Sequence, residues 1–443
     1  MIFHHGRPQQ FCDGLPRRDF LRLGLGGLTL STLLRQEARA TTPGRKKSVI
    51  YIILDGGPSH IDMYDLKPDA PAEYRGPFRP IATKLPGVRI CEHMPMQARI
   101  MDRLALLRGV QSVENDHFLS EVYSGLPRTA GKRPAFGSVT SRLAGNTSAM
   151  PTYVSLNREG DDRFEFEKPH YAGSGHAPFR PFGSAVEDLS PAKSLDRLAD
   201  RRRLLTAFDT IRRDLDKGAL TGIDHFQAQA LDMITSPKVR DAFDIGKEPG
   251  RVLEAYGHRA GKTTHQTAKQ ILYDWDARPF LMARRLVEAG VRVVTLRVGS
   301  WDHHSGAASD IFLSLRLMLP LLDRSIYALV EDLRARGLTD DVLVVVLGEF
   351  GRTPKITPLG PGREHWADAG CALLCGGGLK MGQVIGETDA RAERAVTGAT
   401  NFQNIMATIY RVLGVDTKEM IADFNGRPQH ILTDREPIRA LLG

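Results

Sequence analysis

The sequence predicts an α/β sandwich with a mainly parallel central sheet and helices on both faces. Two observations predict this fold class. Three short runs consist almost entirely of valine, isoleucine and leucine, at 49–54, 291–298 and 342–347, as expected of parallel strands that are buried on both faces. Segments with apolar residues at helical spacing separate the runs, which is typical of strands alternating with helices.

Three helices are expected, at 277–288, 311–336 and 401–413. The first runs into Gly290 and the last into Gly414, and glycine is the usual residue after a helix end. Pro320 is expected to interrupt the middle helix in part, because proline lacks the backbone N–H of a helical turn. A weaker fourth strand is expected at 372–375, before three glycines.

The first forty residues have the layout of a signal peptide. Arg17 and Arg18 precede an apolar run of about a dozen residues, and Ala38-Arg39-Ala40 provides small residues for cleavage. The paired arginines resemble the twin-arginine form. We therefore expect delivery by the twin-arginine export machinery to the periplasm or another extracytoplasmic location. The apolar run is shorter than the roughly twenty residues that span a bilayer, so no permanent membrane anchor is expected. An amphipathic N-terminal helix is the alternative, but three glycines weaken it.

The remainder, 41–443, is expected to form a single domain. Residues 150–270 read as an insertion over one edge of the sheet, with helices at 195–215 and 226–234, and serve either as a lid or as a structural flap. Without the signal peptide, 54 basic and 49 acidic residues leave a charge of +5. This mild surplus contains no basic block with interleaved aromatics, so nucleic-acid binding is not predicted.

Cysteine use argues against a disulfide framework, because three cysteines remain after the signal peptide. Cys371 and Cys375 lie in an apolar string, where they are expected to be small core residues and not metal ligands.

A carboxylate follows each of the three strong strands at once: Asp55, Asp302 and Glu349. Parallel strands share one carboxyl edge, so these side chains are expected to converge there. Three converging carboxylates repel one another, and a divalent cation is the simplest compensation. His304 shares one side with Asp302 if the segment is extended, and His365 follows the third strand on a loop. The sequence therefore predicts a metal centre.

Each part of this pattern also has a simpler interpretation. Asp55 can cap a helix, Glu349 and Arg352 can form a local ion pair, and Trp-Asp-His-His can be a surface loop. Their joint placement favours the metal centre. Carboxylate and imidazole ligands without thiolate suit Zn, Mn, Ca or Mg, and histidine favours Zn or Mn.

Several strings together resemble one exported bacterial family, the domain of unknown function 1501, which is regarded as sulfatase-like within the alkaline phosphatase superfamily. They are Gly-Gly-Pro-Ser-His-Ile-Asp at 56–62, Trp-Asp-His-His at 301–304, Gly-Glu-Phe-Gly-Arg-Thr-Pro at 348–354 and Gly-Arg-Glu-His-Trp at 362–366. The resemblance implies an alkaline-phosphatase-like fold with metals at the carboxyl ends of the strands. It marks as candidate ligands Asp55, Asp302, His304, Glu349 and His365.

The resemblance departs from sulfatases at the nucleophile. Sulfatases carry a cysteine, converted to formylglycine, at the start of a helix, and the corresponding stretch at 115–128 has no cysteine. Ser59 and a metal-activated water are the alternatives. His117 is a candidate ligand or general acid–base group, with core packing as its simpler role. Arg352 is expected to pair with the oxyanion of the substrate.

Two functions therefore remain open. The first is a metal-dependent hydrolase of phosphate or sulfate esters, which the acid–histidine set favours. The second is a binding or structural protein that keeps the fold and has lost catalysis, which the missing nucleophile favours. We expect the hydrolase.

Overall fold

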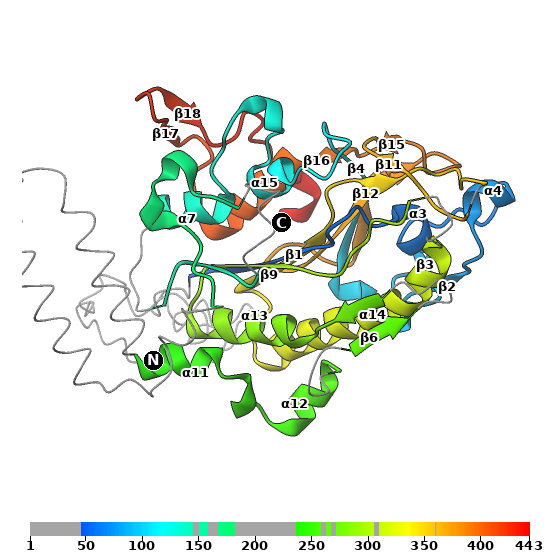
Figure 1. Cartoon of the computed structure of the whole chain (residues 1–443), viewed down its shortest axis with the longest axis horizontal. Coiled ribbons are helices and arrows are strands. Elements are labelled where there is room, and N and C mark those ends of the chain that lie inside the picture. The colour runs from blue at the N-terminus through cyan, green and yellow to red at the C-terminus, as the bar shows by residue number, and fades with distance from the viewer. Residues whose placement is uncertain are drawn as a thin grey trace, which may run out of the picture. The chain divides into compact units, whose positions relative to one another are not determined.

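The structure is a computed structural model, and it describes residues 46–144, 150–157, 167–181, 236–257, 263–266, 272–304, 310–358 and 360–443. The expected α/β fold with a mainly parallel central sheet is confirmed (Figure 1). The strands of the sheet run in the order β13-β4-β12-β9-β1-β8-β5, and β16 pairs with β4. Their bounds are Ser48–Ile53 (β1), Ala105–Gln111 (β4), Tyr153–Ser155 (β5), Val293–Arg297 (β8), Val342–Leu347 (β9), Gly370–Gly376 (β12), Gln383–Ile385 (β13) and Thr400–Asn401 (β16).

The direction of the strands decides which loops meet. β1 is central and fully buried, and it pairs in parallel with β8 and with β9. β12 is the exception, because it runs antiparallel to both β9 and β4. Two antiparallel pairings in succession make β4 parallel to β9. The carboxyl ends of β1, β4, β8 and β9 therefore lie at one edge of the sheet.

Helices cover both faces of the sheet, as expected, because alternate residues of the strands face opposite sides. Ile50 and Ile52 belong to a core that includes α13 and α14. Val49 and Tyr51 belong to the opposite core with α6, α7 and α15. Figure 1 shows α13 and α14 on one side of β1 and β9, and α7 and α15 on the other. The bounds are Ser120–Ser124 (α6), Phe136–Ala144 (α7), Arg278–Ala289 (α13), Ile311–Ala335 (α14) and Phe402–Leu413 (α15).

The ends of the long helices follow from their sequences. α13 ends at Gly290, whose φ of 110° is left-handed, and α15 begins with a capping box of Asn401 and Asn404. The expected partial interruption at Pro320 is wrong. The helix α14 is 25 residues long and continues through Pro320. Pro320 lies on the exposed face of α14, where water can bind the carbonyl that its missing N–H leaves unpaired.

Shorter elements surround the sheet. The remaining α-helices are His60–Met63 (α3), Ala72–Arg75 (α4), Pro95–Arg99 (α5), Pro237–Phe243 (α11) and Gly250–Ala255 (α12). The two-stranded ladders pair Pro80–Ala82 (β2) with Arg89–Cys91 (β3), Thr263–Gln266 (β6) with Leu272–Trp275 (β7), Gly351–Arg352 (β10) with His365–Trp366 (β11), Glu387–Thr388 (β14) with Ala395–Thr397 (β15), and Met420–Ala422 (β17) with Pro428–His430 (β18).

The expected insertion at 150–270 begins with β5, which is itself the edge strand beside β8. Farther along the insertion, α11 packs against α13. The helices expected at 195–215 and 226–234, and the signal peptide at 1–40, lie outside the described residues. Residues 47–443 form one compact unit.

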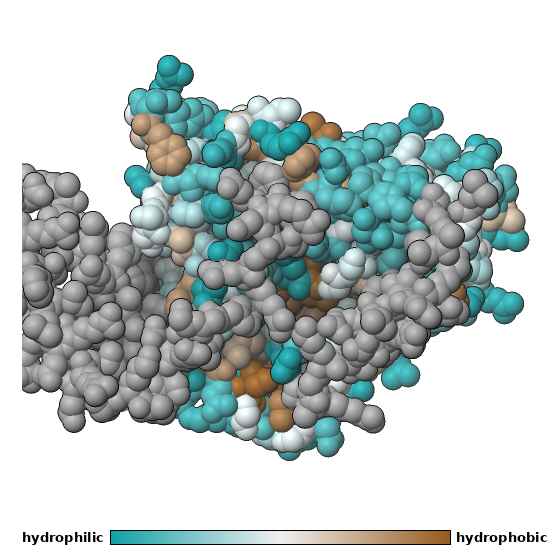
Figure 2. Space-filling model, in the orientation of Figure 1, coloured by the Kyte–Doolittle hydropathy of each residue, from teal (hydrophilic) through white to brown (hydrophobic). Residues whose placement is uncertain are grey.

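Cys91, Cys371 and Cys375 are buried free thiols, which confirms the expected core positions of Cys371 and Cys375. Within the described ranges, no helix combines the length and the apolar character needed to cross a membrane. In the view of Figure 2, the described surface is mainly hydrophilic, with hydrophobic residues showing only in small areas.

Candidate metal centre

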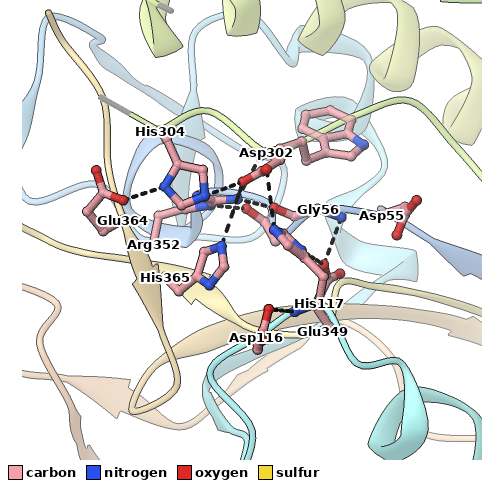
Figure 3. Close-up of polar contacts among 12 residues, drawn as sticks. Asp55, Gly56, Asp116, His117, Asp302, His304, Glu349, Arg352, Glu364 and His365 are labelled. Carbon is pink, nitrogen blue, oxygen red and sulfur yellow. Dashed lines mark hydrogen bonds and ion pairs between the residues drawn. The ribbon is translucent and has the colours of Figure 1, made fainter. Parts of the chain in front are cut away.

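Four side chains converge at the carboxyl edge of the sheet. Asp302 and His304 follow β8, His117 follows β4, and His365 begins β11. One ligand atom from each lies within 4.8 Å of the others. Figure 3 shows the three imidazole rings around the Asp302 carboxylate. The four come from three separate segments, so the fold, and not local sequence, assembles them.

The Asp302 carboxylate is the common neighbour of the three rings. Its Oδ2 lies 3.3 Å from Nε2 of His117. Its Oδ1 lies 2.8 Å from Nε2 of His304 and 3.7 Å from Nε2 of His365. Ligands held about 2 Å from a tetrahedral metal stand roughly 3–4 Å apart, so these separations fit one cation among the four atoms.

The other nitrogen of each ring is already held. Nδ1 of His117 donates to Oε1 of Glu349 at 2.8 Å, and Nδ1 of His304 donates to Glu364.

Nδ1 of His365 donates to the backbone carbonyl of Asn115 at 3.0 Å. A proton fixed on Nδ1 leaves Nε2 with a lone pair, and such outer partners orient the histidines that bind metals. All three rings therefore present Nε2 to the same point.

Unsatisfied atoms support a cation at this point. Among the described residues, the buried side-chain atoms without a hydrogen-bond partner include Nε2 of His117, Nε2 of His365 and Oε2 of Glu349. Buried polar atoms are nearly always paired, and the two Nε2 atoms both face the Asp302 carboxylate, so they need an explanation. Three imidazole nitrogens and one carboxylate oxygen fit Zn or Mn better than Ca or Mg, which prefer oxygen ligands.

The electrostatics of the centre favour positive charge. Burial lowers the pKa of His117, but the neighbouring carboxylates of Asp302 and Glu349 outweigh burial and raise that pKa to about 9. Burial raises the pKa of Asp302, but the neighbouring His117, His365 and Arg352 hold it well below its ordinary value. Asp302 is thus a carboxylate at any physiological pH.

Arg352 holds Asp302 in place. Its side chain is fully buried, and Nη2 lies 2.6 Å from Oδ1 of Asp302. Nε donates to the carbonyl of Gly57 at 2.8 Å, Nη1 donates to the carbonyl of Arg363 at 3.0 Å, and Nη2 also donates to the carbonyl of Gly56. These contacts place Arg352 as a residue that positions Asp302, and its pairing with a substrate oxyanion stays a prediction.

Close backbone contacts shape the loops of the centre. The backbone N–H of Trp301 donates to the carbonyl of Asp55 at 2.8 Å, which joins the loops after β8 and β1. Gly56 has a φ of +109°, and a Cβ there would lie 2.6 Å from the backbone nitrogen of Asp302. Only glycine allows both the turn and this approach.

His303 lies between Asp302 and His304 in the sequence and is buried, whereas the side chains of both neighbours are more than a third exposed. Burial, with the nearby Arg352, lowers the pKa of His303 to about 3, so His303 is a neutral core residue.

Two predicted site residues lie outside the cluster. The Asp55 carboxylate forms an ion pair with Arg297 and points away from the histidines in Figure 3. The Ser59 hydroxyl is buried and donates to Oδ2 of Asp62 at 2.5 Å, and Asp62 is held in turn by Arg363 at 2.7 Å. Asp55 is thus not placed as a ligand, nor Ser59 as a nucleophile, because each is engaged elsewhere.

Glu349 lies beside the cluster and contacts one of its four members, His117. Its Oε1 accepts both Nδ1 of His117 and the backbone N–H of Gly56, the latter at 2.8 Å. It therefore orients a ligand, in place of the direct ligation that the sequence suggested. Glu364 and the Asn115 carbonyl have equivalent roles for His304 and His365, and sequence reasoning missed both. Glu364 directly precedes His365, which was the available signal.

Solved structures that are similar to this chain include a sulfatase, a phosphonate monoester hydrolase and a protein in the alkaline phosphatase superfamily. The PsFucS1 sulfatase from Pseudoalteromonas sp. is 12% identical, with 96% of this chain and 77% of that chain covered and a TM-score of 0.39. The phosphonate monoester hydrolase of Agrobacterium radiobacter is 11% identical, with coverages of 85% and 75% and a TM-score of 0.36. A protein in the alkaline phosphatase superfamily from Vibrio parahaemolyticus is 10% identical, with coverages of 85% and 68% and a TM-score of 0.35. Similarity at this level says nothing about the reaction.

A comparison with curated proteins found no match. The family comparison is more informative, because one family matches residues 46–442, almost the whole of the chain after the expected signal peptide. Its description is "Protein of unknown function (DUF1501)". The chain belongs to this DUF1501 family.

Proposed function

We propose that the chain is a metal-dependent hydrolase of sulfate or phosphate esters. One observation carries the proposal. Three imidazoles, each with Nδ1 held by an acceptor, present Nε2 to one point beside the Asp302 carboxylate. The resemblance of the motif strings to a sulfatase-like family favours these esters over other substrates.

The residues of the chain divide into those that would hold the cation and those that position them. The ligand set is His117, Asp302, His304 and His365. Zn or Mn suits this set best. When bound, the cation supplies Lewis-acid polarisation of an ester oxygen and charge against the developing oxyanion. Arg352 fixes the Asp302 carboxylate, and Glu349 fixes the His117 ring.

The attacking oxygen comes from solvent water in this proposal. Ser59, the serine that follows β1, donates its hydroxyl to Asp62 in a buried network, and the described cysteines are in the core. His304 and Asp302 are both more than a third exposed, so water and substrate reach the centre from their side.

A second candidate function is a metal-binding protein without turnover. It is favoured because, among the described residues, neither Ser59 nor the three cysteines is placed as a nucleophile at the centre. The test is to load the full chain separately with Zn, Mn, Ca and Mg and to measure bound metal per chain by mass spectrometry. Hydrolysis of 4-nitrophenyl sulfate, 4-nitrophenyl phosphate and bis(4-nitrophenyl) phosphate is measured on the same samples. Metal with hydrolysis supports the hydrolase, metal without hydrolysis supports the binding protein, and a chain that takes up no metal ends both proposals.

Export by the twin-arginine machinery to the periplasm or another extracytoplasmic location is also proposed, from Arg17 and Arg18 and the apolar run behind them. Changing both arginines to lysine is expected to leave unprocessed chain in the cytoplasm, seen by fractionation and by its mass. Normal processing of the double variant would reject this export route.

A further inference from the structure

One short segment, residues 112–117, serves two of the three histidines. It ends in His117, whose Nε2 faces Asp302 at 3.3 Å. It also provides the Asn115 carbonyl that accepts from Nδ1 of His365 at 3.0 Å. A shift of this segment therefore moves one ligand of the proposed centre and releases the ring of a second.

Burial of apolar side chains does not hold this segment in place. The side chain of Val113 is 73% exposed, and Asn115 and Asp116 are exposed as well. Hydrogen bonds must therefore fix the segment against the rest of the protein.

Glu121 provides the central pair of these bonds. Its Oε2 accepts the backbone N–H of Val113 and that of Glu114, both at 2.9 Å. The side chain of Glu121 is only 4% exposed, so water does not readily replace these bonds. Glu121 lies on α6, which is anchored in the core through its neighbours Val122 and Tyr123.

Two further bonds support the same attachment. Oε2 of Glu114 accepts from the hydroxyl of Ser120 on α6 at 3.2 Å. At the start of the segment, the N–H of Ser112 donates to the carbonyl of Ala367 at 3.0 Å, two residues after His365. The segment is thus tied on one side to α6 and on the other to the end of β11.

We infer that Glu121 is a positioning residue of the metal centre. By holding the 112–117 segment, it positions His117 and, through the Asn115 carbonyl, the ring of His365. The inference rests on the centre proposed above. Glu121 does not touch the cation or a substrate, and it acts only through the 112–117 segment. Loss of a residue that orients metal ligands typically weakens metal binding about 10- to 100-fold.

The molecule contains a matched control for this role. Asp323 is also a buried carboxylate that accepts two successive backbone N–H groups, those of Met96 and Gln97, at 2.8 and 2.7 Å. Met96 and Gln97 belong to α5, whereas the residues that Glu121 holds lead to the centre. Asp323→Ala therefore removes the same kind of bond without touching the 112–117 segment.

The test compares Glu121→Ala, Glu121→Gln and Asp323→Ala in the full chain. Hydrogen exchange of the 112–118 peptide, followed by mass spectrometry on metal-free protein, is expected to speed up in Glu121→Ala but not in Asp323→Ala. The dissociation constant for Zn, measured by chelator competition, is expected to rise about 10- to 100-fold in Glu121→Ala only. Glu121→Gln keeps a side-chain oxygen that can accept both bonds, so it is expected to recover much of the affinity.

The outcomes separate this inference from the proposed function. Unchanged exchange at 112–118 in Glu121→Ala overturns the role of Glu121, whatever the metal result. An equal loss of Zn affinity in Asp323→Ala overturns it as well, because the effect would then come from lower stability alone. If Glu121→Ala fails to fold, Glu121→Asp replaces it in the same comparison, because its side chain is one methylene shorter and withdraws the carboxylate from the N–H groups of Val113 and Glu114. If the wild-type chain binds no Zn or Mn, the metal centre is rejected. If hydrogen exchange at 112–118 is still faster only in Glu121→Ala, the attachment of the segment by Glu121 stands.

Discussion

The two glutamates that orient histidines differ in their surroundings. Glu349 holds His117 from the end of β9 with a side chain that is 2% exposed, and it also binds the backbone of Gly56. Glu364 holds His304 from a loop, and its side chain is 43% exposed. The same contact is therefore made once inside the protein and once at the surface.

This difference divides the centre into a closed half and an open half. The closed half contains His117 and Glu349 and is built onto the sheet edge, where a hydrogen bond is strong and a lost partner is not replaced by water. The open half contains His304 and Glu364, and water screens and competes with its contacts. The closed half is expected to set the affinity for metal, and the open half to admit the substrate.

The largest effect is expected from Asp302→Asn, because Asp302 contacts both halves and Arg352. The change removes the negative charge, so metal affinity is expected to fall by more than the roughly 100-fold typical of outer partners. The melting temperature with metal present is expected to fall with it, because ligand bound only to the folded state stabilises that state. Bound metal per chain and thermal unfolding with and without Zn check this result. Wild-type metal content in the variant would remove Asp302 from the centre.

A direct test of the two halves compares Glu349→Ala with Glu364→Ala. The buried change is expected to weaken Zn binding about 100-fold and the exposed change about tenfold, the two ends of the usual range for such partners. Glu349→Ala is also expected to lower the stability of the metal-free protein, because it removes the acceptor for the backbone N–H of Gly56. Chelator competition and urea unfolding measure the two quantities. Equal losses in the two variants would contradict the division.

The stability of the folded state is expected to depend on pH through Glu121, which holds the segment that carries His117. Burial raises the pKa of Glu121 from its ordinary 4.5 to about 7, although the N–H groups of Glu114 and Val113 oppose the shift. The folded state then binds the proton on Glu121 more tightly than the unfolded state does. Protonation of Glu121 at low pH therefore stabilises the folded state. That contribution is lost as the pH rises from about 4.5 to about 7, and it is worth a few kcal/mol at most.

Urea unfolding of metal-free wild type and Glu121→Gln across this range checks the sign. The stability of the wild type relative to the variant is expected to fall as the pH rises. A relative stability that stays flat or increases with pH would show that Glu121 ionises as easily in the fold as in the unfolded chain.

The smallest effect is expected from Ser59→Ala, which belongs to neither half. Metal affinity and any turnover are expected to stay at wild-type values, while stability falls by about 1 kcal/mol from the lost bond to Asp62. Unfolding and the ester assays measure both. Loss of turnover with full metal content would return Ser59 to the role of nucleophile.

Much of the fold was predictable because its signals are local. Runs of valine and leucine such as 342–347 identify strands that are buried on both faces, and residues such as Gly290 identify helix ends. β4 escaped prediction because Ala105–Gln111 contains Arg108 and Gly109, which interrupt the β-branched pattern. Its pairing with β12 depends on residues more than 250 positions away. With β4 unseen, nothing assigned His117 to the sheet edge.

The candidate site was predictable to a similar extent. The rule that side chains after parallel strands share one edge is enough to select Asp302 and Glu349. It does not distinguish a ligand from the residue that orients a ligand, because both are carboxylates at the same edge. Asp55 satisfies the rule as well, but the turn at Gly56 and the pairing with Arg297 direct its carboxylate away from the centre. Such distinctions depend on three-dimensional contacts that spacing does not contain.

The short ladder between β10 and β11 has a consequence for how this family can diversify. Arg352 pairs with His365, and the N–H of Thr353 donates to the carbonyl of Glu364 at 2.8 Å, so the long excursion between β9 and β12 is closed at its base. Changes of length and sequence between Ile356 and Pro361, beyond this closure, are expected to leave Arg352 and His365 in place. We therefore expect relatives to keep the base and to vary the tip, so that evolution alters what reaches the centre independently of the centre itself.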